Sequence, residues 1–240
     1  MAYINGKEIL FSPTINYGYD EGKRDEWNDF WDVFQRNGTR TNYERAFYGG
    51  EYSKPIWNNK NFKPKYDIKP VGTAYMMFYF ADIEGDLVEL CERQGITIDT
   101  SEVTNFQYAF TLPKVTRLGK IDMTKCGSQV SQFVWSCYKL HTIDEIIVNE
   151  ATGFTKSNSF TNTGSLVNVK FTGTLAKNGL DLSQNTKLTH ESLMSVINVL
   201  KDYSTDTSGT TWLVTLGSSN LKKLTEEEKQ IATAKGWSLA

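Results

Sequence analysis

A recurring short apolar pattern, spaced 25 to 28 residues apart, is the feature that most constrains how this chain can fold. In each copy, apolar residues stand three positions apart and are followed by alternating apolar residues of β-forming type. The second position of the pattern falls at Leu87, Val115, Leu140 and Leu166, with separations of 115 − 87 = 28, 140 − 115 = 25 and 166 − 140 = 26 residues. One such unit cannot bury its own apolar edge, so successive units must stack to share a core.

A period of this length with this pattern is the signature of leucine-rich repeats. The sequence therefore predicts an α/β fold, a right-handed leucine-rich-repeat solenoid whose short strands form one parallel sheet. The strands are expected near residues 96–99, 120–124, 145–149 and 167–172. Aromatic residues also precede each unit; they are Phe78 and Phe80, Phe106 and Phe110, Phe133 and Trp135, and Phe160.

The flanking segments lack this pattern, so three parts are expected: an N-terminal block at 1–73, repeats at 74–182 and a capping region at 183–240. In the first part, Asn5-Gly6 between apolar runs predicts a β-hairpin, because Asn-Gly tolerates the positive φ angles of a type I′ turn. Aromatic residues at helical spacing predict a helix over 22–36, followed by an irregular segment.

The last part predicts a helical cap, which a solenoid needs because its final strand has an exposed edge. Thr189 is a suitable N-cap for a helix over 189–202 with apolar residues on one face. Thr225 and Glu228 form a capping box at the start of a second helix, over 226–235. The segment "TTWLVTLGSS" between the helices alternates and predicts a strand.

The stretch "WSCYKLHTIDEIIVNE" places Cys137 four residues before His141, which raises the alternative of a nucleophilic pair. The repeat pattern favours a structural interpretation. Cys137 occupies the inward position that Leu112 occupies one unit earlier, and His141 follows the inward Leu140 and should face solvent. Buried cysteines are normally inert, so we expect a core cysteine and no reaction at this site.

No other motif indicates catalysis, a metal or a cofactor, and we expect none of the three. The two histidines are far apart, the three cysteines lack CxxC spacing, and no nucleophile-elbow or phosphate-binding glycine motif occurs. The acidic cluster of Asp82, Glu84 and Asp86 is explained by a loop at a repeat boundary. A catalytic site assembled from distant segments stays open as an alternative.

Charge and hydropathy limit the classes of partner that this chain can bind. Lys plus Arg (26) nearly balance Asp plus Glu (28), which argues against nucleic acid. No apolar run approaches the ~20 residues that cross a bilayer, and no Sec-type signal opens the chain. We therefore expect a protein made in the cytoplasm that does not insert into membranes.

The stretch "FVWSCYKLHTIDEIIV" resembles the repeat of BspA-type leucine-rich repeat proteins: aromatic, Cys, x, x, Leu, x, x, Ile, then a short strand. Gly85-Asp86, Pro113 and Thr163 depart from that pattern near the Cys-equivalent positions. The flanks "NGTRTNYERAF" and "LTEEEKQIATAKGWSLA" are similar to those of BspA-like proteins encoded in prophages of gut Firmicutes. The resemblance implies a phage or prophage protein, virion-associated or host-interacting, with no established enzymatic activity.

Two functions therefore stay open. The first is a non-enzymatic module that recognises a protein or glycan surface with an outward ladder of side chains on the strand face. The second is a structural component of a phage tail or other virion assembly, with the N-terminal block as an attachment or homo-oligomerisation part. The ladder residues expected to bind a ligand are Thr97, Asp99, Lys120, Asp122, Glu145, Asn149 and Lys170.

Overall fold

The structure, a computed structural model, describes residues 2–4, 7–9, 30–49, 57–127, 130–155 and 158–240. Its helices are α2 (Leu87–Glu92), α3 (His190–Val199), α4 (Ser218–Leu221) and α5 (Glu226–Ala234). Its strands are β1 (Ala2–Ile4), β2 (Lys7–Ile9), β3 (Gly72–Thr73), β4 (Glu84–Asp86), β5 (Val103–Asn105), β6 (Lys114–Asp122), β7 (Thr142–Val148), β8 (Asn168–Gly173), β9 (Trp212–Val214) and β10 (Trp237–Leu239).

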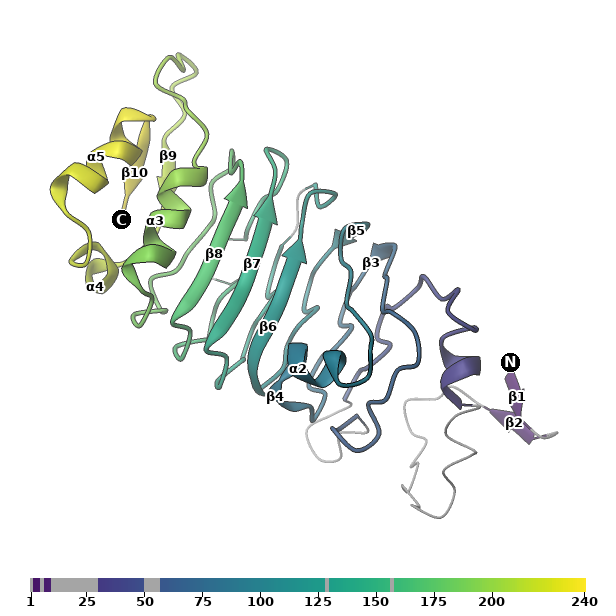
Figure 1. Cartoon of the computed structure of the whole chain (residues 1–240). Coiled ribbons are helices and arrows are strands. Elements are labelled where there is room, and N and C mark those ends of the chain that lie inside the picture. Colours follow the sequence, from purple (N-terminus) through teal and green to yellow (C-terminus); the bar gives the residue numbers. More distant parts are fainter. Residues whose placement is uncertain (1, 5–6, 10–29, 50–56, 128–129, 156–157) are drawn as a thin grey trace.

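The main sheet has four parallel strands in the order β4-β6-β7-β8, side by side in Figure 1. Arg117 lies opposite Thr142, which in turn lies opposite Asn168. The paired residues are therefore 142 − 117 = 25 and 168 − 142 = 26 residues apart, which equals the spacing of the apolar pattern at these positions. The prediction of an α/β fold with a parallel sheet of successive strands is confirmed.

Further parallel pairing occurs before and after this sheet. β3 pairs with β5, and β9 pairs with β10. Isolated parallel bridges join Ile68 to Ile98, Val130 to Phe154 and Leu175 to Leu200. From β3 to β10 the chain advances along one direction, as the colours of Figure 1 show. We call the chain from one paired segment to the next a pass. Each pass thus lies mostly beside the pass that precedes or follows it in the sequence.

One predicted strand is wrong. Residues 96–99 do not join the four-stranded sheet, because Ile98 bridges to Ile68 instead. The first position in the sheet belongs to β4, whose Gly85 lies opposite Val115. The apolar pair Leu87 and Leu90 lies on α2, where a spacing of three residues is also the spacing of one helical turn.

The other three predicted strands are confirmed, although β6 begins six residues earlier than predicted, at 114 instead of 120. Their inward side chains form the core. Leu118, Ile143 and Val169 are each at most 3 % exposed. Rings from successive passes contact one another, first stacked and then edge to face, with centroid separations of 4.8, 5.6, 5.7 and 6.2 Å. These rings are Phe47, Phe78, Phe110, Phe133 and Phe160.

Helix α3 closes the edge of the sheet by side-chain hydrogen bonds. Ser192 Oγ accepts the backbone N–H of Val169 at 3.0 Å, and Ser195 Oγ accepts that of Phe171 at 3.0 Å. Both acceptors are hydroxyls on one face of the helix, three residues apart. These two edge donors of β8 are thereby satisfied, and a further strand cannot add at this position.

The predicted cap is confirmed in most parts. Thr189 caps α3, and Thr225 with Glu228 forms the capping box of α5. Gly236 follows α5 with a φ of +82° and ends it. The strand predicted between the helices is β9, but its pairing with β10 and the short helix α4 were not predicted.

The N-terminal predictions are only partly within the described residues. The hairpin is confirmed by the antiparallel pairing of β1 with β2, while its turn residues 5–6 lie outside the description. Of the helix predicted over 22–36, residues 30–34 are helical and 35–36 form a turn. The remainder, 22–29, also lies outside the described residues.

Candidate functional site

The outward face of the main sheet carries a row of charged side chains. Lys120 on β6 lies directly opposite Glu145 on β7. A register shift between Ile143 and Ile146 places two outward residues of β7 against one position of β8. Glu145 is fixed by Thr172, whose hydroxyl donates to Glu145 Oε1 at 2.9 Å. Lys170 on β8 is exposed.

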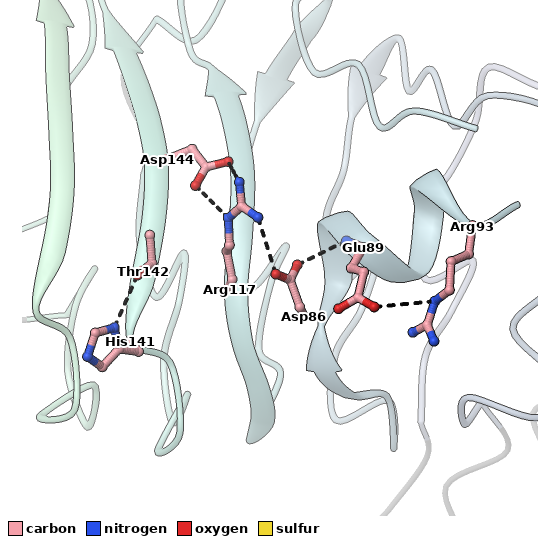
Figure 2. Close-up of polar contacts among 7 residues, drawn as sticks. All are labelled: Asp86, Glu89, Arg93, Arg117, His141, Thr142 and Asp144. Atoms are coloured by element: carbon pink, nitrogen blue, oxygen red, sulfur yellow. Dashed lines mark hydrogen bonds and ion pairs between the residues drawn. The ribbon is translucent and has the colours of Figure 1, made fainter. Parts of the chain in front are cut away.

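Arg117 links three passes of the chain beside this row, as Figure 2 shows. Its guanidinium donates through Nε and Nη2 to the two carboxylate oxygens of Asp144, at 2.7 and 2.8 Å. It also donates through Nη1 to Asp86 at 3.2 Å. These hydrogen bonds, that to Asp144 first, raise the pKa of the guanidinium. A bidentate pair of this kind holds a carboxylate in a defined orientation.

A shallow groove of about 830 Å³ lies between strands β7 and β8 and helix α3. Asp144 and Lys170 reach it from the sheet, so it continues the charged row. Its walls combine hydroxyls, amides, both signs of charge and the thioether of one methionine. The lining residues are Thr142, Ile143, Asp144, Asn168, Val169, Lys170, Thr189, His190, Glu191, Ser192, Met194, Ser195 and Asn198.

The helical wall of the groove is held by a contact with α5. His190 Nε2 lies 2.7 Å from Glu228 Oε1. The backbone N–H of Thr225 bonds the same carboxylate, and this bond is the main reason that the pKa of Glu228 is lowered. The carboxylate is therefore ionised at neutral pH and fixes the start of α3.

The seven residues predicted to bind a ligand do not all lie together. Lys120, Glu145 and Lys170 lie together on the strand face. Thr97 and Asp99 do not lie on that face, because their segment is outside the main sheet. The Thr97 hydroxyl donates to Asp67 at 3.0 Å.

Three of the seven side chains are engaged in turns at the ends of passes. Asp99 accepts the N–H of Ser101, Asp122 that of Thr124, and Asn149 that of Ala151, each two residues ahead. Asn149 Nδ2 also donates to the carbonyl of Thr124. Aspartate and asparagine favour such turns, so the sequence signal at these positions also has a structural explanation. Their part in binding stays a prediction.

The groove itself was not predicted from sequence. Asp144 is next to the predicted Glu145, but only the register shift in β7 brings both outward. The helical wall was predicted solely as a cap. Contact between His190 and Glu228, which are 38 residues apart, follows from tertiary packing and has no local signal.

The suspected Cys137–His141 pair is not formed. Cys137 is 1 % exposed, its thiol donates to the Phe110 carbonyl at 2.9 Å, and burial raises its pKa to about 12. His141 is exposed, and its Nδ1 contacts Thr142 Oγ1 at 3.1 Å (Figure 2). The inward position of Cys137 and the outward position of His141 are confirmed.

Within the described ranges, no group of three or more His, Cys, Asp or Glu side chains is arranged to hold a metal ion. In the same part of the chain, no helix has the length and apolar character to cross a bilayer. Comparison with known proteins adds no assignment, because no family model, curated protein or solved structure matches this chain.

Proposed function

We propose that residues 74–182 are BspA-like leucine-rich repeats stacked as a right-handed solenoid, and that the chain is a non-enzymatic recognition module. Its binding surface is the strand face that carries Lys120, Glu145 and Lys170, continued by the groove beside α3. The ligand is a protein or glycan surface, and the setting is a phage or prophage protein that contacts its host.

The observation that carries the proposal is the placement of Lys120, Glu145 and Lys170 on three adjacent parallel strands. Neighbouring strands lie ~4.8 Å apart, so the charged groups have a fixed spacing on a rigid support. Paired β-strands hold such a surface more accurately than loops do, which lowers the entropy lost on binding.

The groove supports the same proposal through its chemistry. Asn168, Asn198 and the hydroxyl of Thr142 offer donors and acceptors, while Met194 offers an apolar contact. A concave site with a few polar groups around an apolar floor suits a small part of a larger ligand, such as one sugar or one side chain. The shallow form of the groove favours a ligand that also contacts the adjoining strand face.

The test is binding of the purified protein to cell-wall material from Firmicutes, measured by co-sedimentation. The triple variant Lys120→Ala, Glu145→Ala, Lys170→Ala should lose at least about tenfold in affinity while it melts as the parent does. Surface substitutions of this kind usually change stability by less than ~0.5 kcal/mol each. Unchanged affinity in a folded variant would contradict the assignment of this face.

A matched control carries the same charge change elsewhere. Glu102, Lys125 and Lys187 are exposed and lie outside the main sheet and the groove, and their triple alanine variant should bind as the parent does. If the parent itself does not bind and forms a stable ring or trimer in solution, the virion-assembly role becomes the better explanation, since virion parts are symmetric.

A further inference from the structure

The groove beside α3 has few polar side chains free to bind a ligand, because the fold already engages most of them. The hydroxyls of Ser192 and Ser195 accept backbone N–H groups of β8, both at 3.0 Å. The Thr189 hydroxyl contacts that of Ser192 at 2.9 Å, and His190 contacts Glu228 at 2.7 Å. Within the part of the chain that the structure describes, four lining side chains make no hydrogen bond or ion pair: Asn168, Lys170, Glu191 and Asn198.

The charges of these four side chains cancel. Lys170 and Glu191 carry opposite charges, and both are exposed. Asp144, the other carboxylate of the groove, already accepts two hydrogen bonds from a guanidinium on β6, at 2.7 and 2.8 Å. The groove therefore does not require a charged ligand, and the two side-chain amides, Asn168 and Asn198, are left to define its chemistry.

The two amides come from opposite walls of the groove and lie near its two ends. Asn168 directly precedes Val169, whose N–H donates to Ser192, so it lies beside the first turn of α3. Asn198 follows Ser192 by six residues on the same helix, about 9 Å along its axis at ~1.5 Å per residue. Met194 lines the groove between them and is half-buried. The groove thus offers an amide, a thioether and an amide along the side of β8 that α3 covers (Figure 1).

From this arrangement, and resting on the proposed recognition role of the groove, we propose that its ligand is a polymer of N-acetylated amino sugars. The acetamido group has one N–H donor and one C=O acceptor, and a side-chain amide offers the complementary acceptor and donor. Where alternate units of such a polymer face the same way, their acetamido groups recur after two sugar units, a length comparable to the separation of the two amides. The ring between them packs its C–H groups against Met194, whose flexible thioether adapts to an irregular surface.

An extended peptide also carries amides, but it fits the groove less well. Successive residues of an extended chain are only ~3.3 Å apart, and such peptides are normally captured by a free sheet edge. The edge of β8 is closed here by the hydroxyls of Ser192 and Ser195. The free groups of the groove are side chains at its two ends, which suits a ligand that is bonded at two separated points.

The experiment is isothermal titration calorimetry of the full chain with the hexasaccharide of chitin and, for comparison, that of cellulose, which has a hydroxyl in place of each acetamido group. The parent should bind the chitin hexasaccharide and bind the cellulose one at least about tenfold more weakly, because the second leaves the two amides without matched partners. The double variant Asn168→Ala, Asn198→Ala should lose about tenfold or more in affinity for the chitin hexasaccharide. The control Gln230→Ala, which removes an exposed amide on α5 outside the groove, should bind as the parent does.

A second variant, Asn168→Asp with Asn198→Asp, keeps the size of both side chains and removes only their N–H donors. It should fold as the parent does and bind the chitin hexasaccharide more weakly. Equal affinity of the parent for the two hexasaccharides, binding of neither, or unchanged affinity in the folded alanine variant would overturn the proposal.

These outcomes are distinct from failure of the strand-face role. Cell-wall binding that needs Lys120, Glu145 and Lys170, without affinity for the chitin hexasaccharide, would overturn the amino-sugar ligand and leave the strand face as the recognition surface. If protease treatment of the cell-wall material then abolishes that binding, the ligand is a protein. Binding of the chitin hexasaccharide as expected, without binding to cell-wall material, would support the groove ligand and contradict the strand-face role.

Discussion

The part of the chain with parallel pairing is less regular in its first half, which carries β3, β4 and β5, than in its second half, which carries β6, β7 and β8. In the first half, paired residues are 98 − 68 = 30, 103 − 72 = 31 and 114 − 84 = 30 positions apart, and β3, β4 and β5 are two or three residues long. In the second half the separations are 25 and 26, and β6, β7 and β8 have nine, seven and six residues.

This difference indicates that contacts between buried side chains persist when more residues separate one strand from the next, whereas backbone pairing becomes shorter. The extra residues of the first half form α2 and its neighbouring turn. Two register shifts fall there, at Gly72/Thr73 and at Gly85/Asp86, against one in the second half, at Ile143/Ile146. The buried rings Phe47, Phe78 and Phe110 nevertheless stay in contact through the same passes. A non-directional apolar contact can absorb a change of length that a hydrogen-bond ladder cannot.

The largest expected loss of stability comes from filling a close backbone contact, of which one example lies in each half. At Gly173 in the regular half, φ is +90° and an added Cβ would lie 2.0 Å from the Val148 carbonyl oxygen. At Gly49 in the irregular half, the corresponding distance to the Phe80 carbonyl oxygen is 1.8 Å. Each change to alanine should lower the free energy of unfolding by more than about 4 kcal/mol, measured in urea.

Gly95 is the matched control for Gly173, because its φ is +69° and an added Cβ would have no atom within 4 Å. Gly95→Ala should cost only about 1 kcal/mol, from the left-handed backbone alone. A cost for Gly49→Ala close to that of Gly95→Ala would show that the irregular passes can separate, and that their close approach is not required.

The next largest loss of stability is expected at the edge of the main sheet, where α3 covers β8. The double variant Ser192→Ala, Ser195→Ala leaves the N–H groups of Val169 and Phe171 without acceptors, at a total cost of about 2 to 3 kcal/mol. Amide exchange at these two positions should speed up before exchange in β6 does. Ser219→Ala, at an exposed position of α4, should change nothing. Equal slow exchange in parent and double variant would contradict the capping role.

Sequence reasoning succeeded where the repeat is regular and failed where it is not. The spacing of Val115, Leu140 and Leu166 placed β6, β7 and β8 in the correct order, because inward positions recur with the pairing register. Leu87 fitted the same apolar spacing but belongs to a helix, since Asp86 caps it by accepting the Glu89 N–H. An i, i+3 apolar pair is compatible with both structures, and only packing decides between them.

The candidate site shows the same limit. The strand-face residues Lys120 and Lys170 could be placed from the repeat, because residues flanking an inward position point outward. The groove could not, because it needs α3 beside β8, which depends on hydroxyl contacts 23 and 24 residues apart in the chain.

A smaller difference is expected between the buried cysteines of the two halves, in their rates of reaction with thiol reagents. Burial raises the thiol pKa of Cys137 in the regular half and of Cys91 on α2 to about 12 in each case. Both should react slowly with thiol reagents at pH 8. Cys137 should be the slower of the two, because α2 is a short helix that can open locally. Rapid modification of Cys137 in the folded protein would revive a reactive site.

The same pKa values predict a pH dependence. An unfolded thiol titrates near pH ~8.5, so between about pH 9 and 12 the folded state keeps protons that the unfolded state has lost. These groups therefore contribute stability below that range, and the contribution falls as pH rises through it. Cys137→Ala should flatten the fall and cost about 1 to 2 kcal/mol at pH 7, because the Leu112 N–H loses the thiol as an acceptor.

The smallest loss of stability is expected from removing the ion pairs that join the two halves. Arg117 on β6 bonds Asp86 at the end of β4 and Asp144 on β7. All three side chains are partly exposed, so Arg117→Ala should cost about 1 kcal/mol or less, and high salt should reduce the difference. Lys125→Ala, at an exposed position, is the control. A cost that salt does not reduce would show that Arg117 acts through packing instead.

The central claim, that successive passes pair in parallel in the register described, is tested most directly by disulfide trapping. Lys120 and Glu145 are direct partners on β6 and β7, and disulfides form at Cα separations of about 4.4 to 6.8 Å. The pair Lys120→Cys, Glu145→Cys should therefore form an intramolecular disulfide under mild oxidation. The pair Lys120→Cys, Lys170→Cys spans two strand spacings, ~9.6 Å, and should not. Trapping of both pairs or of neither would contradict the register.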